Sequence, residues 1–219
     1  MHFKDKRIVT IETPDDMLTI LQEKGNPMKD YKKGTKITVF NKMQQDYSYV
    51  LSEAPGKNMA FRPELTPSQI LSLGAFEGKY LNDCLLEYPK EWYFSALKNG
   101  KLCPGKADPT VNALGVKSRL SLKGWKEYGW LPNRGGHVAK QHPILSDGSV
   151  NHDKRGWFEW FCRYYMGRRQ PDIDEVQIKR YHAFQRHVAQ VRANCKKGDE
   201  TCRPVQRQAL LQWAHNPFI

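Results

Sequence analysis

The chain has few acidic residues for its size and no long apolar run. Its 219 residues hold 35 Lys and Arg against 23 Asp and Glu, which gives a formal net charge of +12. This balance favours a polyanionic partner, because a positive field attracts phosphates and binding them releases counterions. No stretch approaches the roughly 20 apolar residues that span a bilayer. We therefore predict no membrane helix.

We also expect neither a leader peptide nor a framework of disulfides. The first residues, MHFKDKRIVTIETPDD, contain no apolar segment of the kind found in a secretory signal. The five cysteines are odd in number and irregularly spaced, which is typical of reduced thiols. We therefore expect a cytoplasmic protein, or a nuclear one if the source is eukaryotic.

Several enzyme signatures are absent. The sequence has no GxxxxGK(S/T) loop, no GxGxxG, no GxSxG and no HExxH, which argues against P-loop kinases, dinucleotide oxidoreductases and zincins. Cys195 and Cys202 enclose KKGDET and His215 follows, but no CxxC or HxxxH pair completes a zinc site. PDIDEVQIK begins like the acidic centre of a nuclease, but the acid-x-Lys pair is missing because Gln177 stands two before Lys179. We predict neither a metal nor a cofactor.

Helical patterns dominate what is present, so the expected fold class is mainly α (α+β). Residues 1–60 predict a small mixed α/β region, with strands at KRIVTIET, KITVFN and 47–51 and a helix at PDDMLTILQEKG. Residues 61–219 predict a helical, DNA-binding domain. Further helices are expected at LTPSQILSLGAF, GKYLNDCLLEYP, KEWYFSALKNG, 156–169, about 173–195 and about 203–215, with a long loop at about 132–153.

Basic side chains gather in the C-terminal third. Residues 151–219 hold 13 Lys and Arg against 7 Asp and Glu. On the expected helix 173–195, Lys179, His182 and Arg186 recur at i, i+3 and i+7, and such a face would lie along a phosphate backbone. A solvated helix face is the alternative. The predicted nucleic-acid-binding residues are Lys79, Arg168, Arg169, Lys179, Arg180, His182, Arg186, Arg203 and Arg207.

The stretch GWFEWFCRYYMGRR, residues 156–169, has six aromatic residues among fourteen and no plainly polar helical face. A helix of this kind is usually buried, and we expect its first aromatic residues to pack in the core. The residues closer to the arginines are candidates to stack on a base taken out of a duplex, with core packing as the alternative. These base-stacking candidates are Trp160, Tyr164 and Tyr165.

The stretch GAFEGKYLNDC, residues 74–84, crowds four polar side chains into a short span. Glu77 and Asp83 would activate water or stabilise a cationic transition state, Asn82 would read a base edge, and Lys79 would contact phosphate. Gly74 and Gly78 free the backbone for close approach. The candidate catalytic residues are Asp83, Glu77 and Asn82. The alternative is a helix N-terminus at which Lys79 and Asp83 form an i,i+4 pair.

Four segments carry a family resemblance: LSLGAFEGKYLNDC, RGWFEWFCRYYMGRR, QIKRYHAFQRHVAQV and CRPVQRQALLQWAHN. Together they resemble a widespread set of uncharacterised helical proteins, over about residues 61–219. That set is distantly similar to helical DNA-glycosylase-like proteins of phage modified-base biology and phage defence. The resemblance implies an enzyme that hydrolyses the N-glycosidic bond of a flipped, modified or damaged base.

These observations lead to one preferred function and two alternatives. We expect a DNA-binding glycosylase whose partner is duplex or single-stranded DNA, with antiviral defence among its settings. The first alternative is a non-catalytic module that reads DNA or RNA. The second is a protein-interaction role in which the basic face docks an acidic partner.

Overall fold

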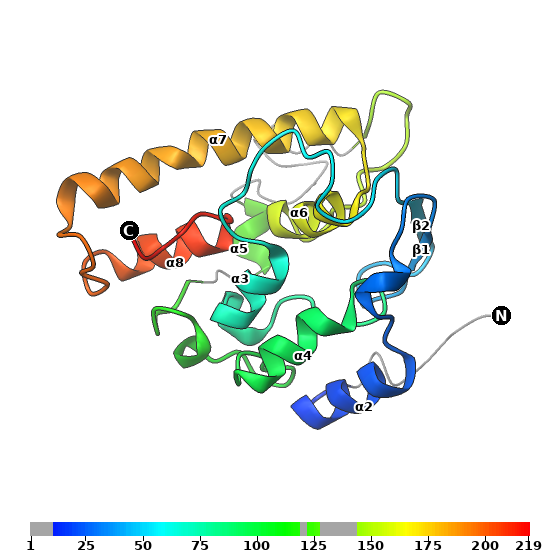
Figure 1. Ribbon diagram of the computed structural model, residues 1–219, viewed down its shortest axis with the longest axis horizontal. Coiled ribbons are helices and arrows are strands. Elements are labelled where there is room, and N and C mark those ends of the chain that lie inside the picture. The colour runs from blue at the N-terminus through cyan, green and yellow to red at the C-terminus, as the bar shows by residue number, and fades with distance from the viewer. Residues whose placement is uncertain (1–10, 119–121, 128–143) are drawn as a thin grey trace.

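The computed structural model describes residues 11–118, 122–127 and 144–219 (Figure 1). The fold is mainly α with one small two-stranded sheet, as the sequence predicts. Its N-terminal elements are α2 (Pro14–Lys24), the 3-10 turn η1 (Met28–Asp30), β1 (Lys36–Val39) and β2 (Tyr47–Val50). The two strands pair antiparallel, with Lys36 opposite Val50. The predicted strand KRIVTIET lies largely outside the described residues.

Capping residues fix where the first helices begin. Thr13 accepts a hydrogen bond from the backbone N–H of Asp16, whose carboxylate accepts one from the backbone N–H of Thr13 in return. The same reciprocal pair joins Thr66 and Gln69 at the start of α3 (Pro67–Leu73). Each reciprocal pair is a capping box, which satisfies backbone N–H groups that have no partner within the helix. The predicted start at Thr66 is confirmed.

The middle of the chain is more irregular than predicted. After α3 come η2 (Phe76–Gly78), α4 (Lys90–Lys98), η3 (Pro109–Val111) and α5 (Leu122–Glu127). The predicted helix at GKYLNDCLLEYP is wrong, because residues 79–88 form successive turns. Leu81 has a φ of 61°, which a helix does not accept, and the side-chain amide of Asn82 donates to the carbonyl of Gly78. Local side-chain bonding of this kind competes with helix formation.

Three helices complete the fold: α6 (Trp157–Met166), α7 (Pro171–Asn194) and α8 (Pro204–Gln212). In Figure 1, α7 runs along one edge of the molecule with α8 beside it and α6 beneath its N-terminal half. A disulfide joins Cys195, directly after α7, to Cys202, just before α8, with the Cα atoms 5.7 Å apart. The prediction of reduced thiols is therefore wrong for this pair, which the reversal of the chain brings together. Cys84, Cys103 and Cys162 are free.

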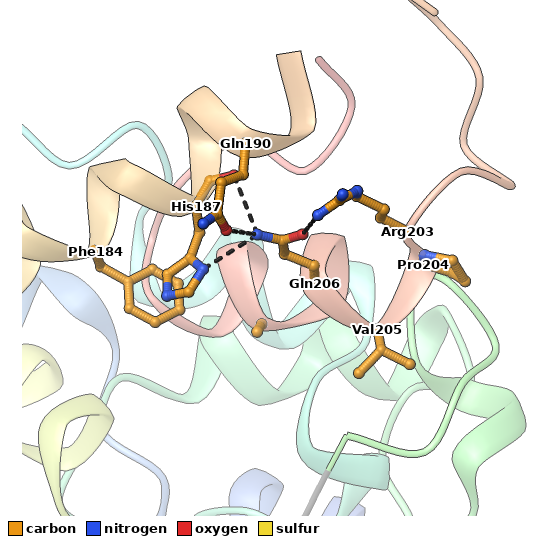
Figure 2. Close-up of a pocket in the computed structure, with 8 residues that line it drawn as sticks. Phe184, His187, Gln190, Arg203, Pro204, Val205 and Gln206 are labelled. Atoms are coloured by element: carbon orange, nitrogen blue, oxygen red, sulfur yellow. Dashed lines mark hydrogen bonds between the residues drawn. The ribbon is translucent and has the colours of Figure 1, made fainter. Parts of the chain in front are cut away.

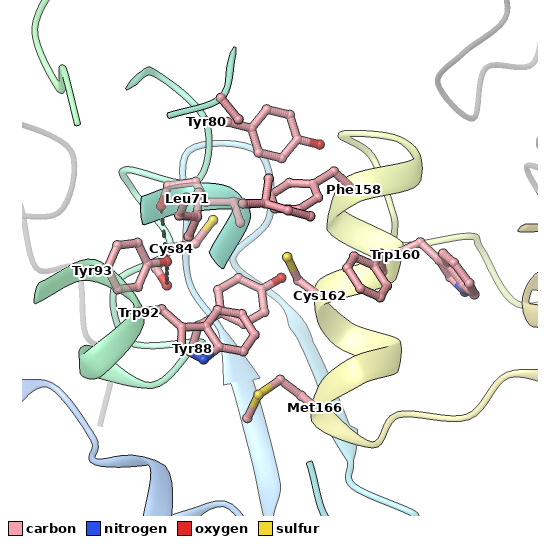
Figure 3. Packing of buried hydrophobic residues seen from close by; sticks show 14 of the residues in the cluster. Leu71, Tyr80, Cys84, Tyr88, Trp92, Tyr93, Phe158, Trp160, Cys162 and Met166 are labelled. Atoms are coloured by element: carbon pink, nitrogen blue, oxygen red, sulfur yellow. Dashed lines mark hydrogen bonds between the residues drawn. The ribbon is translucent and has the colours of Figure 1, made fainter. Parts of the chain in front are cut away.

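The hydrophobic core surrounds α6. One cluster of buried residues extends from Ile11 to Ala214 and includes parts of both predicted regions. From α6, Phe158, Cys162 and Met166 point toward the segments around Tyr88 and Trp92, whereas Trp160 points to the opposite side of the helix (Figure 3). The helix is therefore covered on several sides, which explains why its sequence has no polar face.

The predicted loop at about 132–153 is described only from residue 144 onward. There Ile144 and Val150 form an isolated antiparallel bridge around a turn. Asn151 and Asp153 then enter the interior, so the end of the predicted loop is part of the core. Within the described segments, no helix has both the length and the apolarity needed to cross a membrane.

Candidate nucleic-acid interface

The aromatic residues proposed to stack on a base are engaged in the core. Trp160 is 0% exposed, and its indole N–H donates to Asp174 at 2.8 Å. Tyr164 is 2% exposed and stacks on Trp160 with ring centroids 5.0 Å apart, and its hydroxyl oxygen accepts a hydrogen bond from the backbone N–H of Ala60 at 2.9 Å. Tyr165 is half-buried, with its ring edge-on to Trp92. The base-stacking prediction is wrong for Trp160 and Tyr164, because the core already covers their rings.

A buried charged network lies beside α6, and sequence reasoning missed it. The guanidinium of Arg163, 0% exposed, donates to Glu87 at 2.6 Å and to Asp153 at 3.1 Å. Glu159, one helical turn earlier, lies 3.5 Å away. A fully buried guanidinium requires such partners, since an unpaired buried charge is strongly destabilising. The available signal was Glu159 and Arg163 at i,i+4 within an otherwise apolar helix.

Arg168 belongs to the same network and is not a phosphate ligand, contrary to prediction. It makes two hydrogen bonds to Asp153, at 2.8 and 2.6 Å, in the two-pronged geometry that suits guanidinium and carboxylate. Burial by itself would raise the pKa of Asp153, but Arg168 and Arg163 outweigh it and hold that pKa below its usual value. Asp153 therefore carries its charge inside the protein.

Asp83, predicted to be catalytic, is held by a third arginine. Arg155 donates to both of its oxygens, at 2.8 and 2.7 Å, and the backbone N–H of Lys42 donates to Oδ2 at 2.9 Å. Burial opposes ionisation, but the hydrogen bonds and charge of Arg155 lower the pKa of Asp83 overall. Both oxygens are engaged, so the prediction that Asp83 activates water is wrong. The neighbouring Glu159 differs from Asp83: burial raises the pKa of Glu159, even though Arg163 and Arg155 lie nearby.

Three further predicted phosphate ligands bind main-chain carbonyls instead. Arg169 donates to the carbonyls of Tyr164 and Lys57, at 2.6 and 2.9 Å. Arg207 is 0% exposed and donates to the carbonyls of Cys202, Pro217 and Ile219. The ammonium group of Lys79 is bound by the carbonyls of Pro104 and Gly105. These side chains hold loops in place, and the phosphate-binding prediction is wrong for them.

Arg180 is partly buried and lies over an aromatic ring. Its guanidinium lies 5.2 Å from the ring centroid of Trp213 and donates to Gln177 at 2.8 Å. Burial lowers the pKa of Arg180 to about 10, so it remains a cation at neutral pH. Its position over an aromatic face indicates a packing role.

The remaining predicted cations are exposed. Lys179, His182 and Arg186 lie on the outer face of α7, and Arg203 lies at the start of α8. We call these four, together with the exposed neighbours Arg192, Lys196 and Lys197, the basic surface. The sequence holds no Asp or Glu between Glu175 and Asp199. Lys179 pairs with Glu175 at 2.5 Å, and no carboxylate among the described residues pairs with Arg186 or Arg203.

A shallow hollow of about 670 Å³ lies between α7 and α8 (Figure 2). Phe184, Val205 and Ala209 contribute most of its apolar wall. Arg203 of the basic surface also lines it. The hollow and the basic surface are therefore continuous. Of these lining residues, the sequence predicts only Arg203 as a binding residue, because the side-by-side packing of two helices does not follow from the periodicity of either helix.

The two remaining catalytic candidates lie in a strained segment. Phe76 and Glu77 have φ angles of 52° and 58°, which side chains other than glycine rarely adopt. A Cβ at Gly78 would meet the backbone nitrogen of Cys103 at 2.8 Å. The close backbone approach predicted at Gly78 therefore occurs, and the segment that approaches is the protein's own backbone at Cys103.

Glu77 and Asn82 are both 6% exposed. Neither Oε1 of Glu77 nor Oδ1 of Asn82 has a hydrogen-bond partner among the described residues. No hydrogen bond or ring contact within those residues joins Glu77 or Asp83 to Trp160 or Tyr164. The expected convergence of the polar cluster with these aromatic residues is therefore not seen as a direct contact in the described structure.

Comparisons with known proteins add no relative. No family model, curated protein sequence or solved structure matches the chain. The resemblance to glycosylase-like proteins therefore stays a prediction. Among the described residues, no group of three or more His, Cys, Asp and Glu side chains is arranged to hold a metal ion.

Proposed function

We propose that this protein binds nucleic acid through the basic surface of α7 and the start of α8. The observation that carries the proposal is the difference in exposure among the arginines. Arg186 and Arg203 face water without a carboxylate partner in the described structure, so their donors are available to an anion. Lys179 and His182 extend this surface along one helix, which spans roughly 10 Å between residues 179 and 186 at 1.5 Å per residue.

Binding of this type depends on salt. Each phosphate neutralised contributes about 0.9 to the slope of log affinity against log salt for duplex DNA, and about 0.7 for a single strand. The test is a titration of fluorescent 20-mer oligonucleotides at several salt concentrations. We expect the triple variant Lys179→Ala, Arg186→Ala, Lys197→Ala to bind on the order of 100-fold more weakly at 0.1 M salt, with a flatter slope.

The matched control removes the same number of charges elsewhere. Lys32, Lys33 and Lys98 are exposed lysines outside the basic surface, and their triple alanine variant should bind almost as well as the wild type. Equal losses in the two variants would mean that net charge, rather than this surface, governs affinity. Absence of salt-dependent binding by the wild-type protein would refute the proposed function.

A second candidate function, base excision, rests on Glu77. A buried carboxylate oxygen without a partner, in a backbone held at positive φ, is the kind of strained group found at functional sites. As a catalytic residue, Glu77 would orient the water that replaces the departing base and stabilise the oxocarbenium-like sugar. Under this proposal the partner is DNA with a modified or damaged base.

The experiment measures base release and abasic-site formation on a panel of modified and unmodified DNAs. Glu77→Gln keeps the side-chain volume and should lower the rate at least about 100-fold, whereas Glu12→Gln, at an exposed position, should leave it unchanged. Full activity in Glu77→Gln, or no base release by the wild type, would eliminate this candidate.

A further inference from the structure

The wall of the hollow between α7 and α8 is apolar and rigid. Val205 is 57% exposed, so its side chain presents unburied apolar surface at the edge of the hollow. The ring of Phe184 lies parallel to Trp213 with ring centroids 4.6 Å apart, and Trp213 stacks in turn on Trp157 at 4.7 Å. This row of rings connects the wall to the core and fixes the orientation of Phe184.

A polar edge faces this wall. The side-chain amide of Gln206 donates to Gln190 at 2.7 Å and is within 3.1 Å of Nδ1 of His187. Its oxygen accepts a hydrogen bond from Arg203 at 3.1 Å (Figure 2). Glutamine, histidine and arginine side chains supply the donors and acceptors that pair with the edges of bases. The hollow therefore combines an apolar wall, a hydrogen-bonding edge and a cation.

The chemistry of the lining narrows the choice of occupant. An acidic peptide would be recognised by several cations, but Arg203 is the single Lys or Arg that lines the hollow in the described structure. A nucleotide has a flat apolar ring with polar edges beside a negative phosphate, and this matches the lining. A base inside a duplex is stacked and paired on both sides, so only an unpaired base can enter.

We propose that the hollow binds an unpaired nucleobase of a strand whose phosphates contact the basic surface. The inference rests on the proposed function and deepens it, because it makes single-stranded nucleic acid the preferred partner. Base contacts would then add to the phosphate contacts, since stacking of a base on an aromatic side chain strengthens binding to a single strand.

The first experiment leaves the protein unchanged and varies the probe. Wild-type protein is titrated with a single-stranded DNA 20-mer, the matching duplex, and a strand of equal length in which every base is removed. We expect the single strand to bind at least about tenfold more tightly than the other two at equal salt. Equal affinity for the intact and the base-free strand would overturn the inference while leaving the proposed function intact.

The second experiment fills the hollow. Ala209→Leu adds apolar bulk to the wall without changing charge or adding a ring, and should reduce the preference for single strand over duplex about tenfold. Ala60→Leu is the control, at an exposed alanine outside the hollow. Circular dichroism verifies that both variants fold. If Ala209→Leu does not fold, the titration of the wild-type protein with the three probes tests the inference by itself.

Three outcomes separate the possible failures. Displacement of the single strand by a poly-glutamate 20-mer at equal charge concentration, as effectively as by unlabelled DNA, would show an acidic protein partner and overturn the inference. Absence of salt-dependent binding to any nucleic acid would refute the proposed function itself. A retained single-strand preference in Ala209→Leu would place the base elsewhere and also overturn the inference.

Discussion

Two pairs of arginines have the same side chain and opposite surroundings: one pair lies in or just after α6, and the other lies on α7 and at the start of α8. Arg163 and Arg168 are almost completely buried, and each has at least one carboxylate within hydrogen-bonding distance. Arg186 and Arg203 are exposed, with no such partner in the described structure. The comparison teaches that an arginine near aromatic residues indicates a binding site only if its guanidinium faces water.

Desolvation explains the difference. Transferring a charge from water into the interior costs several kcal/mol, which only well-placed opposite charges and hydrogen bonds offset. Arg163 meets this requirement through Glu87, Asp153 and Glu159. An exposed guanidinium incurs no such cost and keeps its donors for a ligand, for which its planar shape suits phosphate.

The largest expected effect tests the buried side of the comparison. Arg163→Ala leaves the buried carboxylate of Glu87 without its cation and Asp153 with Arg168 alone, and should lower the free energy of unfolding by about 3–5 kcal/mol. Arg186→Ala, on the basic surface, should change it by less than about 0.5 kcal/mol. Urea denaturation followed by circular dichroism measures both. Comparable losses in the two variants would contradict the division between structural and exposed arginines.

A smaller effect concerns pH and two histidines, of which His215 is buried and His152 is half-buried. Burial lowers the pKa of His215, and burial with the charge of Arg163 lowers that of His152. Their folded pKa values lie below the unfolded value of about 6.5, so the unfolded chain takes up protons first. Their contribution to stability is therefore complete above that value and declines as the pH falls through it.

Thermal unfolding at pH 7.5 and at pH 5.5 measures this decline. We expect a lower melting temperature at pH 5.5, and a smaller difference in the double variant His152→Gln, His215→Gln. His187, which is not among the charges acting on His152 or His215, serves as the control, since His187→Gln should leave the difference unchanged. An unchanged difference in the double variant would show that other groups control stability in this range.

Local structure was largely predictable. Thr66, Pro67 and Gln69 form the expected capping box of α3, and the helices predicted at 173–195 and 203–215 correspond to α7 and α8 with shifted ends. These features depend on residues a few positions apart. The predicted helix at GKYLNDCLLEYP failed because the contact of Gly78 with Cys103, distant along the chain, holds this segment in turns.

The candidate site was less predictable, because exposure depends on distant partners. Arg168 and Arg186 are both arginines on or next to aromatic, basic helices, and nothing in their immediate neighbours separates them. Arg168 is buried because Asp153 reaches it from the end of a long loop. Arg207 is buried because the C-terminal segment turns back over it. Periodicity identifies the face of one helix and does not show what covers it.

By itself, the sequence determined the mainly α class, the beginnings of several helices and the excess of positive charge. These follow from local propensity, capping and composition, which act within a few residues. Only the tertiary structure decided which cations face water, which aromatic rings form the core, and that α7 and α8 enclose a hollow beside the basic surface. The physical reason is that burial and charge pairing join residues far apart in the chain, such as Arg163 with Glu87.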